Sequence, residues 1–143
     1  MNSYTTMKKK HQEEVNAFPM FFAFSKEQLY EGMEKLGLDK KDTDKLGSIG
    51  AGGYIRKADK ESFKAMFARH EEERQAAIQA DSTGDGFIFD MFLCELDDHE
   101  YGYIGDIEDT LNALGITEED FVNNPRLVHG LEAAATAIDS RRY

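Results

Sequence analysis

Residues 87–96 are apolar on nearly all sides, and this run constrains the fold more than any other part of the chain. Periodicity alone does not distinguish a buried helix from a buried strand in such a run. Residues 91–96 contain no β-branched side chain, which favours a helix. We therefore expect a buried helix here, and we expect its cysteine, Cys94, to act as a small buried hydrophobic residue.

Capping and stop signals predict further helices on both sides of this run. Ser25, with Gln28 three residues later, has the pattern of a capping box, and Gly37 ends the helix that Ser25 starts. Similar signals predict a long helix from Asp59 to about Ala80, a helix from Asp106 to Gly115, a short turn capped by Thr117, and a last helix opened by Asn124 and Pro125.

Two short segments have the character of strands. Residues 20–24 form an apolar run bounded by Pro19 and Ser25, and residues 54–56 follow the glycine-rich stretch 47–53, which is expected to be the most flexible part of the chain. Residues 39–46 are expected to be a charged loop. We therefore predict an α+β fold dominated by about five helices, with a small two-stranded sheet that pairs residues 20–24 with residues 53–57.

The length of the chain is typical of one domain. It has 143 residues, and a chain of about 150 residues buries roughly two-thirds of its unfolded surface on folding. Residues 1–16 are polar and only weakly periodic, so we expect a loose N-terminal arm or a short helix there. Residues 17–143 are expected to form a single compact acidic domain.

The negative charge of the chain is concentrated in its second half. The net charge is −11, yet residues 1–57 hold ten Lys or Arg against eight Asp or Glu, whereas residues 58–143 hold seven against twenty. No Lys or Arg occurs in residues 75–125, which contain thirteen acids. Direct binding of nucleic acid by this half is therefore disfavoured, because phosphate contacts need cationic side chains.

Aromatic side chains are interspersed among these acids, a pattern typical of a surface that binds a basic protein. Exposed acids accelerate association with a basic partner, and aromatic side chains supply buried contact area. The alternative is a solvated face that only keeps the protein soluble. The predicted partner-binding residues are Asp97, Asp98, Glu100, Tyr101, Tyr103, Asp106, Glu108 and Asp109.

One loop resembles a calcium site but lacks essential ligands. Asp81, Thr83, Asp85 and Gly86 match the first positions of an EF-hand loop. The twelfth position, which needs a bidentate Glu, is Phe92. We therefore expect a turn between two helices with Asp85 as a cap, and no metal.

No motif in the sequence requires catalysis. Residues 47–53 have the glycine spacing of a phosphate-binding loop, but Gly53 and Tyr54 stand where Lys and Ser or Thr are needed. We predict no catalytic residue and no cofactor. No apolar run approaches the length of about 20 residues that a membrane span needs, and no signal peptide follows the lysines at 8–10, so we expect a cytoplasmic protein.

Four segments of the chain resemble a known group of proteins. They are residues 21–25, 31–37, 50–57 and 99–101. These segments look like those of an uncharacterised family of small acidic proteins associated with phages and mobile elements of Gram-positive bacteria. The resemblance implies a genomic neighbourhood rather than an activity. By analogy, small acidic proteins from such neighbourhoods block host defence nucleases, including CRISPR effectors, by occupying their basic channels.

Three functions are compatible with these features. The first is an acidic protein-binding module, acting as a nucleic-acid mimic or as an inhibitor of a basic nuclease or CRISPR effector. The second, which is the main alternative, is a metal-binding regulator or small enzyme that uses the loop from Asp81 to Asp85, or His99 with Glu100. The third is a regulatory subunit that associates with itself through residues 47–53.

Overall fold

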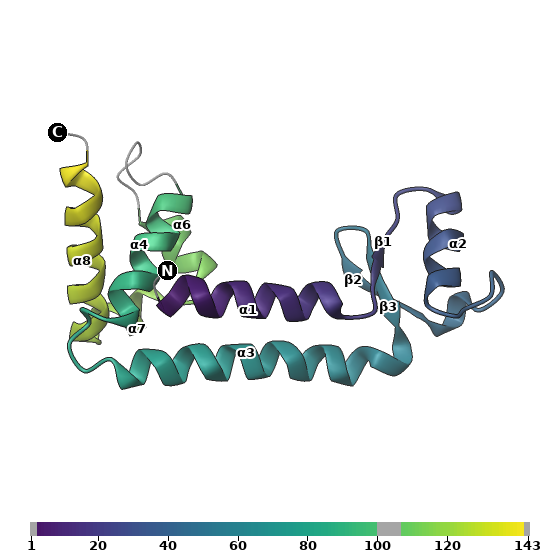
Figure 1. The fold of residues 1–143 in the computed structure, drawn as a ribbon, viewed down its shortest axis with the longest axis horizontal. Helices are drawn as coiled ribbons and strands as arrows, with labels where there is room; N and C mark the ends of the chain where they lie inside the picture. Colours follow the sequence, from purple (N-terminus) through teal and green to yellow (C-terminus); the bar gives the residue numbers. More distant parts are fainter. Residues whose placement is uncertain (1–2, 100–106, 142–143) are drawn as a thin grey trace. The chain divides into compact units, whose positions relative to one another are not determined.

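The computed structural model describes residues 3–99 and 107–141 of the chain (Figure 1). The described residues form seven α-helices, three strands and two short 3-10 helices. In chain order they are α1 (Ser3–Ala17), β1 (Phe21–Phe22), α2 (Lys26–Lys35), η1 (Thr43–Lys45), β2 (Leu46–Gly50), β3 (Gly53–Arg56), η2 (Lys57–Asp59), α3 (Lys60–Ala80), α4 (Phe87–Asp98), α6 (Glu108–Ala113), α7 (Glu118–Val122) and α8 (Pro125–Ser140). The predicted α+β class with a dominant helical part is confirmed.

The chain divides into two compact units. Unit 1 comprises the residues up to His11 and from Glu73 onward, and unit 2 comprises Gln12–Glu72. Helices α1 and α3 each contribute one part to unit 1 and another to unit 2. The single domain expected over residues 17–143 stays a prediction.

Helix α4 lies at the centre of the core of unit 1. Its residues Ile88, Met91, Phe92 and Leu96 are fully buried, and α4 packs along α8. The helix expected for the apolar run is thus confirmed. Cys94 packs against this core but is only half-buried.

The sheet of unit 2 has three antiparallel strands in the order β1-β3-β2. The predicted pairing of residues 20–24 with 53–57 is confirmed, with Phe21 opposite Tyr54 and Phe22 opposite Gly53. Two predictions for this region need correction, namely a charged loop at 39–46 and a flexible stretch at 47–53. Leu46–Gly50 instead forms strand β2. The turn after β2 uses positive φ angles at Gly50, Ala51 and Gly52, so the glycines make a tight hairpin possible.

The N-terminal segment is a helix rather than a loose arm. Helix α1 spans fifteen residues, and its Tyr4 is buried in the core of unit 1. In the C-terminal half, Thr117 caps α7 and Asn124 caps α8, as expected. Asp106, the expected start of the helix that contains α6, lies outside the described residues. None of the helices in residues 3–99 and 107–141 has the length and apolar character required to cross a membrane.

Candidate functional site

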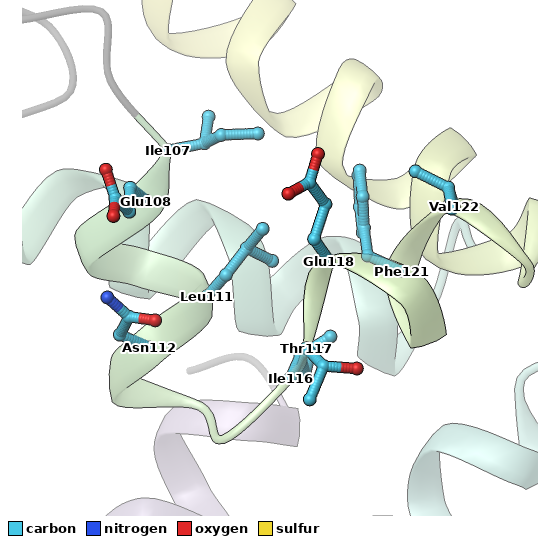
Figure 2. Close-up of a pocket in the computed structure, with 9 residues that line it drawn as sticks. All are labelled: Ile107, Glu108, Leu111, Asn112, Ile116, Thr117, Glu118, Phe121 and Val122. Carbon is cyan, nitrogen blue, oxygen red and sulfur yellow. The ribbon is translucent and has the colours of Figure 1, made fainter.

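A pocket lies between α6 and α7 in unit 1 (Figure 2). Its volume is about 480 Å³, and its apolar lining comes from Ile107, Leu111, Ile116, Phe121 and Val122. Leu111 points from α6 toward α7, and Phe121 stands on the facing side. Leu111 and Phe121 also belong to the buried core of unit 1, so the floor of the pocket is continuous with that core.

The short connection between α6 and α7 holds the two walls together. Gly115 adopts a φ of 68° and ends α6, and the Ile116 N–H donates to the Leu111 carbonyl at 3.0 Å. Thr117 then caps α7, because its Oγ1 accepts the N–H of Asp120 at 3.1 Å. Only Ile116 therefore separates Gly115, which ends α6, from Thr117, which caps α7.

The rim of the pocket is acidic. Glu108 and Glu118 line it from α6 and α7, together with the polar Asn112 and Thr117. Residues 107–122 contain five acids, namely Glu108, Asp109, Glu118, Glu119 and Asp120, and no Lys, Arg or His. An apolar floor can take an apolar side chain, and carboxylates accept hydrogen bonds from cationic groups. The arrangement is therefore suited to binding a basic segment with an apolar anchor.

The structure separates the predicted site residues into different environments. Glu108 lines the pocket, and Asp109 is exposed on the same helix. Asp97 forms an ion pair with Arg141 at 3.0 Å, and Asp98 forms one with Lys8 at 3.3 Å. The remaining predicted residues, Glu100, Tyr101, Tyr103 and Asp106, lie outside the described residues.

The loop that resembles an EF-hand is held by its own hydrogen bonds. The carboxylate of Asp81 accepts backbone N–H groups of Thr83, Gly84, Gly86 and Ile88 at 2.9–3.3 Å. Burial raises the pKa of Asp81, but these four N–H donors outweigh burial and lower it below its ordinary value. The N-cap residue of α4 is Gly86, and Asp81 supplies the side-chain acceptor for the N–H groups of Gly86 and Ile88 at the start of the helix, which corrects the expectation that Asp85 is the cap. Asp85 instead pairs with Nε2 of His129 at 2.6 Å.

Comparison with protein-family models gives one match. The model of a family of unknown function, DUF7659, matches residues 3–137, which is nearly the whole chain. The chain belongs to the DUF7659 family. No curated protein and no solved structure matches it. The expected membership of an uncharacterised family is therefore confirmed, and the matched region covers all of unit 2 and most of unit 1 of this DUF7659 protein.

The DUF7659 chain also holds a buried carboxylate that its sequence did not reveal. Glu95 of α4 is only 6% exposed, and its Oε1 accepts the hydroxyl of Tyr4 and the ammonium of Lys8, both at 2.7 Å. His99 lies 3.7 Å from its other oxygen. Burial raises the pKa of Tyr4, and the hydrogen bond to Glu95 raises it further, so the phenol keeps its proton and donates the hydrogen bond to Glu95.

This cluster ties α1 to α4 in the DUF7659 protein. Ligand atoms of Cys94, Glu95 and Asp98 lie within 4.8 Å of one another, a grouping that a metal ion could use. However, the Lys8 ammonium already forms ion pairs with both Glu95 and Asp98. Burial and the nearby Asp98 also raise the pKa of the Cys94 thiol, which disfavours the thiolate that metals bind. We therefore assign the cluster a structural role.

The pocket contains residues that sequence reasoning missed in the DUF7659 chain. They are Ile107, Leu111, Asn112, Ile116, Thr117, Glu118, Phe121 and Val122. One signal was available in the sequence, since the apolar Phe121 and Val122 directly follow three consecutive acids, and the structure leaves Val122 60% exposed. An exposed apolar side chain beside acids is a feature of binding surfaces, although single exposed apolar residues are common.

Proposed function

We propose that this protein is an acidic protein-binding module whose partner is a basic protein. The observation that carries this proposal is the α6–α7 pocket, whose lining combines apolar side chains with the carboxylates of Glu108 and Glu118. The segment that builds the pocket has five acids and no cation. A partner segment would place an apolar side chain in the pocket and Lys or Arg residues against the rim.

The two parts of the site have different physical roles. Burying one large apolar side chain contributes about 1.5–3 kcal/mol, whereas an exposed ion pair contributes roughly 0.2–1 kcal/mol. The apolar anchor therefore supplies most of the affinity. The acids increase the association rate and select basic partners over acidic ones.

The family resemblance adds a class of partner to this proposal. By analogy with small acidic proteins of phages and mobile elements, which often block host defence nucleases, the partner would be a host nucleic-acid-binding protein with a basic channel. We therefore propose a cytoplasmic inhibitor of such a protein, with a nuclease or CRISPR effector as the preferred target. The acidic rim would occupy the place of nucleic-acid phosphates, and the pocket would hold a side chain of the channel wall.

Affinity purification from a bacterial lysate that contains defence nucleases tests this function. The immobilised bait is the wild-type chain or the double variant Glu108→Lys/Glu118→Lys. A matched control, Glu132→Lys/Asp139→Lys, has the same net charge but alters exposed acids of α8 outside the pocket. We expect a basic protein to be retained by the wild type and the control and to be lost from the pocket variant.

A second variant tests the apolar part of the site. Val122→Ser removes an exposed side chain from the pocket lining and should leave the core intact. Its affinity for the captured protein should fall several-fold, and binding of the wild type should weaken as salt increases. Retention of the same protein by all three baits, or binding that is insensitive to both Val122→Ser and salt, would show that this pocket is not the binding site.

A further inference from the structure

We propose that unit 2 carries a second binding site, which takes an acidic peptide segment in extended conformation. The site lies between β2, β3 and the start of α3. All of its residues belong to unit 2 and none to the α6–α7 pocket, so the two proposals can fail separately.

The first observation is a cavity with an apolar floor. The cavity has a volume of about 490 Å³, and Ile49, Ile55 and Phe63 supply its apolar lining. Ile55 is 2% exposed and fixes the floor, and the ring of Phe63 packs edge-on against Phe18 with ring centroids 5.2 Å apart. A cavity of this size is large enough for one aliphatic or aromatic side chain.

The second observation is a group of three lysines on the rim. Lys57, Lys60 and Lys64 line the cavity, and all three are exposed. Within residues 3–99 and 107–141, none of them forms an ion pair with a carboxylate. Asp59, which lies between Lys57 and Lys60 in the sequence, is bonded to Arg56 at 2.7 Å. Lys60 is also the first residue of α3, where the helix dipole adds positive potential.

The third observation is an open strand edge at the cavity. In the sheet order β1-β3-β2, strand β2 has a neighbour on one side only among the described residues. Gly47, Ser48 and Ile49 of β2 line the cavity. Every second residue of an edge strand directs its N–H and C=O away from the sheet, and an extended peptide can pair with these groups.

These three features select a peptide over other anionic ligands. A small anionic amphiphile could satisfy the lysines and the apolar floor, but it has no backbone to pair with β2. An added strand supplies backbone hydrogen bonds along β2, places an apolar side chain over Ile55, and directs acidic side chains at the lysines. The lack of side chains at Gly47 and Gly50 leaves room for close approach of such a strand.

The test is selection from a displayed library of random peptides against the full-length chain. We expect the enriched peptides to contain an aromatic or aliphatic residue flanked by Asp or Glu. Fluorescence anisotropy then compares the strongest peptide on the wild type, on Lys57→Gln/Lys60→Gln/Lys64→Gln, and on a matched control, Lys26→Gln/Lys35→Gln/Lys41→Gln. The control removes the same charge from exposed lysines of α2 and the loop that follows it.

The expected result is a loss of about tenfold in affinity for the pocket variant and little change for the control. Amide chemical shifts of Leu46–Gly50 should move when the peptide binds. Enrichment of peptides without acids, or equal affinity of the pocket and control variants, would overturn the proposal. Binding of decanoate in the absence of any enriched peptide would also overturn it and would assign the cavity to a small anionic amphiphile.

Discussion

The hydroxyl of Tyr4 donates a hydrogen bond of 2.7 Å to Oε1 of Glu95, and both residues are buried in unit 1. This bond links the first turn of α1 to the central helix α4. The Tyr4 ring also packs edge-on against Phe87, with ring centroids 5.6 Å apart. The N-terminal helix is therefore part of the core of unit 1 rather than an appendage.

Replacing Tyr4 with phenylalanine should destabilise unit 1 by about 2 kcal/mol, because a hydrogen bond to a charged buried group is lost while the ring packing remains. The measurement is urea unfolding followed through the amide signals of Phe92 and Leu96, which lie in the same core. Tyr30→Phe is the control, since the Tyr30 hydroxyl makes no hydrogen bond with any described side chain or backbone group. A loss below about 0.5 kcal/mol would contradict the role assigned to this bond.

The stability of unit 1 should depend on pH through Glu95. Burial raises the pKa of Glu95, but hydrogen bonds from Lys8 and Tyr4 outweigh burial and hold it below its ordinary value. A carboxyl with a lowered pKa in the folded state stabilises that state above the unfolded pKa, and this contribution is lost as the pH falls through the folded pKa. We therefore expect stability to fall as the pH decreases below the ordinary pKa of a Glu side chain, about 4.3.

The variant Glu95→Gln isolates this effect. It should be less stable than the wild type at neutral pH, because Lys8 loses its buried partner, and it should lose less stability on acidification. Unfolding free energies measured at stepwise pH for both proteins give the comparison. Parallel pH profiles would mean that other carboxylates dominate the acid response.

The loop before α4 should depend on Asp81 and hardly on Asp85. Asp81→Ala leaves four backbone N–H groups without their acceptor and should cost about 2 kcal/mol. Asp85→Ala removes only an exposed pair with His129 and should cost less than about 0.5 kcal/mol. Thermal unfolding with and without millimolar CaCl₂ measures both effects. A calcium site would instead give a calcium-dependent melting temperature that both variants abolish.

Gly84 should tolerate no side chain. Its φ is 91°, and an added Cβ would lie 2.5 Å from the carbonyl oxygen of Arg126 at the start of α8. Gly84→Ala should therefore cost about 2 kcal/mol or more. Gly37→Ala provides the comparison, because Gly37 also has a positive φ, of 77°, but an added Cβ would meet nothing within 4 Å. Equal losses in urea unfolding would show that backbone strain alone matters at both positions.

Much of the fold could be predicted because local signals and burial agree. The run at 87–96 contains no β-branched residue in its second half and forms α4. The expected capping box at Ser25 is present in a modified form. The Ser25 hydroxyl accepts the N–H of Gln28, and the Gln28 side chain accepts the N–H of Phe24 in place of that of Ser25. The pairing of β1 with β3 followed from two short apolar segments.

For strand β2 and helix α1, the local sequence pattern does not indicate the structure that forms. Strand β2 has two glycines in five residues, a composition that disfavours strands, and it is stabilised by its pairing with β3. Helix α1 was expected only as one of two alternatives, because its sequence shows no apolar face and, among its described residues, only Tyr4 is buried. Similarly, the acids at 97 and 98 seemed unpaired because their cations, Arg141 and Lys8, lie more than 40 positions away. These are tertiary effects that local patterns do not contain.

The split of unit 1 between the two ends of the chain has a consequence for biosynthesis. Tyr4 and its acceptor Glu95 are 91 positions apart, and unit 2 is the single continuous segment Gln12–Glu72 between them. Because a ribosome releases the chain from its N-terminus, unit 2 has all of its residues first and can fold first. The first turns of α1 emerge early but must wait for α4, so the order of synthesis separates the folding of the two units in time.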